Sequence, residues 1–232
     1  MHIRPYLSTS FAALFLLLLA TQLHAQQVQS PEDRARLAFE ARLSHAIKKM
    51  TASVNAENAE LNTRLSAINA VAPLEKKHLD STHVAANVSD LIEFIEYLKH
   101  ARAASDTLAQ NYEDTLYILA TTLPSDIDGH GIQDMDASFH EDRAAFNVFL
   151  EAMTKLYSDV LNVLIYLQHT PYSLAHNEFT FNDKKDLKEY QNRMKMVDGD
   201  NKELNQANED MRKANAKANT HTKSPSDDLN GN

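Results

Sequence analysis

The chain has 232 residues, a formal net charge of −9 and no cysteine. Without cysteine it cannot form disulfides, bind a metal through thiolates or use a thiol nucleophile. An acidic chain is a poor partner for nucleic acid or anionic lipid, so cations or a basic protein surface are the expected partners. The length allows one domain with a sizeable core.

Residues 1–25 are predicted to form a signal peptide. The unbroken apolar run from Phe11 to Leu19 follows a short segment that carries Arg4, and this order is typical of secretory signals. The run is shorter than the roughly 20 apolar residues of a spanning helix, and Ala25 is a suitable cleavage site. The mature chain is therefore expected in the periplasm or outside the cell, without an integral membrane segment. A retained N-terminal anchor is the alternative.

Residues 26–182 are predicted to form an all-α bundle core. Prolines are few and separate long stretches in which apolar residues recur every three or four positions, as on one face of a helix. No stretch has a strand pattern. Three helices of roughly 30 to 40 residues would each be about 45 to 60 Å long. An elongated antiparallel up-down bundle is expected, with a fourth, more polar helix at the C-terminus.

The first two helices have clear boundaries in the sequence. Ser30 is the expected N-cap of a helix that starts at Pro31 and ends near Val71. The second helix is expected to end at Leu123, because a residue before proline avoids the helical region. The apolar stripes of the two helices are Ile47, Met50, Val54, Leu61, Leu65 and Ile68, and then Val88, Leu91, Ile95, Leu98, Leu108, Tyr112, Leu116 and Leu119.

The third helix is expected to begin at Ser138, which forms a capping box with Glu141. It has the widest apolar face in the mature chain and is therefore predicted to be the central helix. That face consists of Phe146, Phe149, Leu150, Met153, Leu156, Tyr157, Val160, Leu161, Leu164, Ile165 and Leu167. Pro171 to Asn182 is expected to be a turn region, with Phe179 and Phe181 covering one end of the bundle.

Residues 183–218 are predicted to form the polar C-terminal helix, and residues 219–232 a disordered tail. The helix has a heptad-like seam with asparagine at three successive a positions. The seam consists of Leu187, Tyr190, Met194, Val197, Asn201, Leu204, Asn208, Met211, Asn215 and Ala218. The favoured interpretation is a fourth bundle helix, and the alternative is a coiled coil with a second chain.

Residues 125–136 have the strongest pattern that indicates a metal site. They contain two of the four glycines and the four aspartates Asp126, Asp128, Asp134 and Asp136. Carboxylates at alternate positions, with glycines that allow a tight turn, are the arrangement that calcium requires.

In EF-hand register Asp126, Asp128, His130 and Asp134 take ligand positions 1, 3, 5 and 9, but position 12 is Ala137 instead of glutamate. The segment more closely resembles the calcium loops of thrombospondin type 3 repeats, except that His130 replaces an aspartate. This local resemblance implies calcium. The alternative is a helix connector made of turn-forming residues.

Two histidine patterns suggest transition metals less strongly. Asp136 and His140 are spaced i,i+4 and could bind zinc together with His130. Asp80 and His83 have the carboxylate and histidine spacing of di-iron bundles, but they lie in a polar connector, so solvated charge is the favoured interpretation.

The sequence has no nucleophile elbow, phosphate-binding loop, zinc-protease motif or haem motif, so no enzyme activity and no cofactor other than calcium are predicted. The predicted function is an exported structural or interaction protein that binds a protein partner or itself. The alternative function is calcium or metal binding through residues 126–136.

Overall fold

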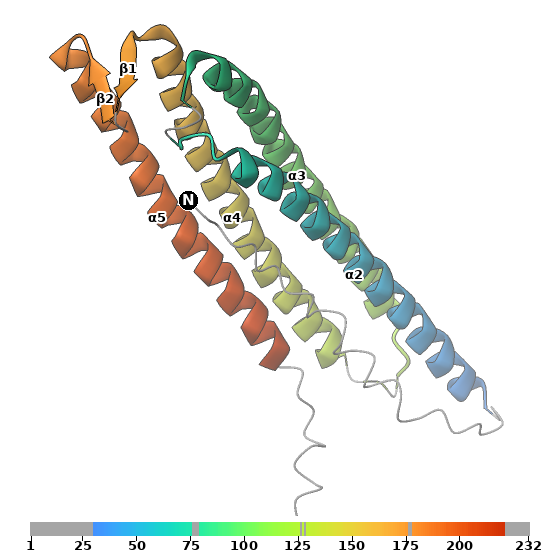
Figure 1. Ribbon diagram of the computed structural model, residues 1–232. Coiled ribbons are helices and arrows are strands. Elements are labelled where there is room, and N and C mark those ends of the chain that lie inside the picture. Colours follow the sequence, from blue (N-terminus) through green and yellow to red (C-terminus); the bar gives the residue numbers. More distant parts are fainter. Residues whose placement is uncertain (1–29, 76–78, 126, 128, 176–177, 221–232) are drawn as a thin grey trace, which may run out of the picture. The chain divides into compact units, whose positions relative to one another are not determined.

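The computed structural model describes residues 30–75, 79–125, 127, 129–175 and 178–220 (Figure 1). Its elements are α2 (Pro31–Val71), α3 (Ser81–Thr121), α4 (His130–His169), β1 (Tyr172–Ala175), β2 (Glu178–Phe181) and α5 (Lys184–Thr220). The predicted all-α class, with three long helices and a C-terminal fourth, is confirmed.

The chain divides into two compact units. Unit 1 contains Ala59–Ala103 and Phe146–Asp210, and unit 2 contains the described parts of Tyr6–Asn58, Ala104–Ala145 and Met211–Asn232. The boundary between the units falls within each of the four helices, so every helix contributes residues to both.

Within unit 1, α3 and α4 run antiparallel. Phe94 of α3 packs edge-on against Tyr157 of α4, with ring centroids 4.9 Å apart. Arg102 lies later on α3, and it pairs with Glu151, which lies earlier on α4. This reversal of order agrees with the predicted up-down arrangement.

The start of α2 follows the sequence prediction. The Ser30 hydroxyl accepts a hydrogen bond from the Asp33 amide at 3.0 Å, and the Asp33 carboxylate accepts one from the Ser30 amide at 3.3 Å. These reciprocal bonds satisfy two amides that the first helical turn leaves without a partner. The helix ends at Val71 as expected, and Ala72 follows with a φ of 44°, a left-handed conformation typical of helix C-termini.

The predicted start of the third helix at Ser138 is wrong, because α4 begins at His130. The Gly129 carbonyl accepts hydrogen bonds from the amides of Ile132 and Gln133 at 3.1 and 3.3 Å. Ile132 and Met135 also pack against the core of unit 2. The apolar periodicity therefore extends one turn and more before the capping box, and burial of these side chains stabilises the longer helix.

Each unit has its own core. In unit 2, buried side chains from α2, α3 and α4 form one cluster of Phe39, Met50, Tyr112, Leu116, Leu119 and Phe139. In unit 1, α4 contributes an almost continuous buried face of Phe146, Phe149, Leu150, Met153, Leu156, Tyr157, Val160, Val163, Leu164 and Leu167. The wide apolar face predicted for this helix is confirmed, except that Leu161 is only partly buried and Ile165 is exposed.

The apolar residues in the middle of the α5 seam are buried within the chain, whereas Leu187 near its start is exposed. Val197, Leu204 and Met211 are each at most 4% exposed. The buried face is wider than the a and d positions, because Asp200 and Ala207 are buried as well. A wide buried face is typical of a bundle helix, whereas a two-stranded coiled coil buries a narrow seam. The structure therefore supports the fourth-helix interpretation.

The expected turn region Pro171–Asn182 contains a two-stranded antiparallel hairpin, which corrects the prediction that no strand would form. In its register Tyr172 is opposite Phe181 and Leu174 is opposite Phe179. Because side chains alternate between the two faces of a strand, these four apolar residues share one face. The alternation spans too few residues in each strand to stand out from a turn in the sequence.

Candidate functional site

The predicted calcium site is only partly within the described residues. Asp126 and Asp128 lie outside them, whereas His130, Asp134 and Asp136 lie in the first two turns of α4. His130 and Asp134 are spaced i,i+4 on one helix face, and Asp136 points from another. In the part of the chain that the structure describes, no three His, Asp or Glu side chains are arranged to hold a metal ion. The site at Asp126 and Asp128 stays a prediction.

The second predicted metal pair forms a different contact. His140 Nε2 lies 3.3 Å from Asp136 Oδ1, as the i,i+4 spacing suggested, and 3.2 Å from Glu113 Oε1 of α3. The three side chains are about half exposed, so this surface contact is of small energetic value. Glu113 could not be found from the sequence, because it comes from another helix.

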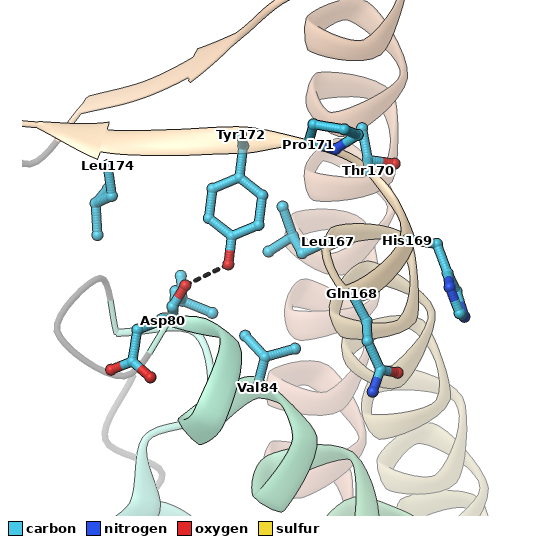
Figure 2. Close-up of a pocket in the computed structure, with 10 residues that line it drawn as sticks. Asp80, Val84, Leu167, Gln168, His169, Thr170, Pro171, Tyr172 and Leu174 are labelled. Atoms are coloured by element: carbon cyan, nitrogen blue, oxygen red, sulfur yellow. Dashed lines mark hydrogen bonds between the residues drawn. The ribbon is translucent and has the colours of Figure 1, made fainter.

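A groove in unit 1 is the strongest candidate for a binding site (Figure 2). It has a volume of about 690 Å³ and lies between the start of α3, the end of α4 and strand β1. Its lining side chains are Leu79, Asp80, Val84, Leu167, Gln168, His169, Thr170, Pro171, Tyr172 and Leu174. Leu79, Val84 and Leu167 are at most 2% exposed, so the surface that a ligand could contact comes mainly from Tyr172, Leu174 and the polar residues.

The hairpin is held in place over this groove by aromatic packing. Phe179 and Phe181 each contact the ring of Tyr190 on α5, with centroids 4.9 and 5.5 Å apart. Phe181 also lies 6.5 Å from Tyr166 of α4. These contacts explain why so short a hairpin forms, since two strands alone are marginally stable. They also agree with the prediction that Phe179 and Phe181 cover an end of the helices.

Tyr172 connects the hairpin to the start of α3. Its hydroxyl donates a hydrogen bond to the Leu79 carbonyl, and Figure 2 shows this bond crossing the groove. Burial raises the pKa of the Tyr172 phenol, and the neighbouring Asp80 charge raises that pKa further. Tyr172 therefore stays a neutral donor at physiological pH.

Asp80, which lines the groove, caps the N-terminus of α3. Its Oδ1 accepts a hydrogen bond from the His83 amide at 3.1 Å, which caps α3, and its Oδ2 contacts His83 Nδ1. The Asp80 and His83 side chains are more than half exposed. The exposure of the two side chains agrees with the interpretation of solvated charge, and their spacing reflects a helix cap that the sequence analysis did not predict.

A second, smaller groove of about 400 Å³ lies between α3 and α4 in unit 1. Three basic side chains line it, but each is paired with a carboxylate. Lys99 contacts Glu96 at 2.6 Å, Arg102 contacts Glu151, and Lys155 contacts Asp200 and Glu203 at 2.9 and 2.6 Å. This pairing leaves little positive charge for an external anion.

Lys155 also belongs to an acidic cluster between α4 and α5. Asp200 is only 5% exposed. Burial raises the pKa of the nearby Asp159 carboxyl, and its hydrogen bond with Asp200 raises that pKa further. The Glu203 and Asp200 carboxylates raise the pKa of Lys155. The cluster therefore retains a charged lysine and fixes α5 against α4.

Unit 2 contains a buried charge network between α2 and α4. The Arg143 guanidinium donates to Glu57 at 2.8 Å and lies 3.5 Å from Asp142. Burial raises the pKa of both carboxyl groups, although the Arg143 charge opposes the shift. A buried network of this kind adds little net stability, because the cost of removing the charges from water offsets most of their attraction.

Comparisons with protein-family models, with curated proteins and with solved structures found no match to this chain. Among the described residues, none of the helices has a sustained apolar stretch of the kind that spans a bilayer. A functional assignment therefore rests on the geometry of the groove and on the sequence features already described.

Proposed function

We propose that the chain is an exported interaction protein that binds a partner protein through the groove beneath its hairpin. The observation that carries this proposal is the groove of about 690 Å³ itself, lined by the exposed Leu174 and the partly buried Tyr172. Export is proposed from the signal peptide pattern in residues 1–25.

The composition of the groove supports binding. Exposed apolar and aromatic side chains beside a few polar groups are typical of protein interaction sites. The aromatic contacts and the Tyr172 hydrogen bond hold the hairpin face in a fixed position. A rigid surface loses little conformational entropy on binding, which favours affinity.

Site-specific photo-crosslinking in the exporting cell tests the proposal. A photoreactive residue replaces Leu174 in the groove or, as the matched control, Val148, an exposed apolar residue of α4 in the same unit. We expect a crosslinked product from position 174 and none from position 148. A product of twice the chain's mass would identify the partner as a second copy.

A second variant, Thr180→Glu, places a charge on an exposed position of the opposite hairpin face and should leave crosslinking at 174 unchanged. Equal crosslinking from positions 174 and 148, or none from 174, would contradict the groove as the binding surface.

A further inference from the structure

Two acidic side chains meet where α4 and α5 pack together in unit 1. Asp200 of α5 is only 5% exposed, and its Oδ1 accepts a hydrogen bond from the Lys155 ammonium at 2.9 Å. Asp159 lies one helical turn after Lys155, so the two residues share the face of α4 that contacts α5. The Asp159 carboxyl forms a hydrogen bond with Asp200. Asp159 and Asp200 are called the acid pair below.

The second carboxylate oxygen of Asp200 indicates where this hydrogen bond ends. Its Oδ2 is buried, and no N–H or conventional O–H donor among the described residues reaches it. A buried acceptor without a donor costs free energy. Two ionised carboxylates cannot satisfy each other, because a carboxylate donates only when it holds a proton. A protonated Asp159 supplies the donor that Oδ2 otherwise lacks.

The surroundings favour a proton on Asp159. Burial raises the pKa of its carboxyl above the ordinary value of 3.8, and the hydrogen bond and negative charge of Asp200 raise that pKa further. The Asn162 amide and the Lys155 charge oppose this shift. Lys155 also contacts Glu203 of α5 at 2.6 Å. Its one positive charge is thus set against three carboxyl groups, and a proton on Asp159 reduces their repulsion.

We propose that Asp159 and Asp200 share one proton and form a pH-dependent contact between α4 and α5. While Asp159 holds the proton, it donates to Asp200 and joins the two helices. When the pH rises, water takes up this proton, and two adjacent carboxylates then repel each other across the contact. The inference is independent of the proposed groove function.

The sign of the pH dependence follows from proton binding. Between the ordinary and the raised pKa of Asp159, the native state binds more protons than the unfolded state. The contribution of the acid pair to stability is therefore full below 3.8 and is lost as the pH rises through the raised pKa.

An NMR titration of the carboxyl carbons in the full mature chain tests the shared proton directly. We expect the Asp159 signal to titrate with a midpoint above 3.8. Asp200→Asn removes the neighbouring charge and offers an amide donor, so the midpoint should fall by about one pH unit or more. Asp198→Asn, at an exposed position of α5, is the matched control and should leave the midpoint unchanged.

Urea unfolding of Asp159→Asn gives a second measurement that does not require a change at the buried Asp200. Asp159 is only partly buried, and asparagine keeps a side-chain donor for Asp200 at every pH. We expect the stability of this variant relative to the wild type to rise as the pH rises through the raised pKa of Asp159.

Three results would overturn the inference. The first is an Asp159 midpoint at or below 3.8. The second is a raised midpoint that Asp200→Asn leaves unchanged, which would assign the shift to burial alone. The third is a stability difference between Asp159→Asn and the wild type that does not vary with pH.

Discussion

The two ends of α4 are built differently. At its N-terminal end in unit 2, an Asp- and Gly-rich segment passes into helix at His130, and its apolar residues Ile132 and Met135 join the core. At its C-terminal end in unit 1, the chain forms a hairpin whose apolar face packs on α4 and α5 and borders a groove. The described end of a dense sequence motif, from His130 on, thus lies in a helix, whereas an unremarkable turn region forms a hairpin that borders the groove.

The largest expected effect is a loss of stability, which should be greater at the N-terminal end of α4 because its aromatic residue is more deeply buried. Phe139 near the start of α4 is 1% exposed, and its ring centroid lies 4.0 Å from that of Tyr112. Phe181 of the hairpin is partly exposed. Phe139→Ala should lower the free energy of unfolding by about 3 to 5 kcal/mol, and Phe181→Ala by roughly half as much, because a partly exposed site leaves a smaller cavity. Urea unfolding of both variants measures the difference. Equal losses would show that the hairpin is as tightly packed as the core.

The next largest loss of stability is expected from removing the hydrogen bond between Tyr172 and the Leu79 carbonyl. Tyr172→Phe keeps the ring but leaves the Leu79 carbonyl without this donor, so stability should fall by about 1 to 2 kcal/mol. The matched control is Tyr117→Phe, since Tyr117 is 72% exposed and its hydroxyl is solvated. Chemical denaturation of the two variants is the measurement. A loss no larger than that of the control would show that the hairpin is held by ring packing alone.

A pH dependence is expected at the N-terminal end of α4. Burial raises the native pKa of Asp142 above its ordinary value of 3.8. Between the ordinary and the raised value the native state binds more protons than the unfolded state, so this group's contribution to stability falls as pH rises through that window.

Asp142→Asn removes this titration, so the stability of the variant relative to the wild type should rise from pH 3 to pH 7. Thermal unfolding across this pH range is the measurement, and Asp134→Asn, at an exposed position of α4, is the control. A pH-independent difference would mean that the Asp142 carboxyl has the same pKa in the native and the unfolded state, which would contradict the expected shift.

The smallest expected effect is a change in stability at Gly131, which tests whether this residue acts as part of a helix or as part of a calcium loop. Gly131 lies in α4, and a Cβ atom there would have no neighbour within 4 Å. Gly131→Ala should raise stability by about 0.5 to 1 kcal/mol, because alanine loses less entropy in a helix. Gly199→Ala, also open and in α5, should gain a similar amount and serves as the control.

The calcium interpretation predicts the opposite, since an EF-hand loop requires glycine at its turn position. Melting temperatures with calcium and with chelator decide between them. A calcium-dependent rise in the wild type that Gly131→Ala abolishes would favour the loop, because an ion that binds the folded state must raise the melting temperature.

Much of the fold could be predicted because its signals are local. The Ser30 cap, the end of α2 near Val71 and the wide apolar face of α4 depend on neighbouring residues or on one helical period. The start of α4 was missed for the same reason, since the capping residues at Ser138 are a strong local signal. Packing of Ile132 and Met135 against other helices outweighed that signal.

The candidate site could not be predicted, because its residues come from three places in the sequence. Leu79 and Asp80 precede α3, Gln168 lies in the last turn of α4, and Leu174 lies in β1. Asp80 stood out only through its spacing from His83, which suggested a metal site and not a groove, and the other residues have no distinctive spacing. The one available hint was the pair of aromatic residues Phe179 and Phe181, which indicated a covered helix end and not a groove beside it.

The sequence by itself determined that the chain is helical, where its first helix starts and ends, and which face of each long helix is buried, because these properties follow from caps and periodicity. Tertiary structure decided that the C-terminal seam packs within the chain, that a hairpin forms after α4, and that Asp80 and Tyr172 border one groove. Those outcomes depend on contacts between distant residues, and the energy of such contacts has no counterpart in local spacing.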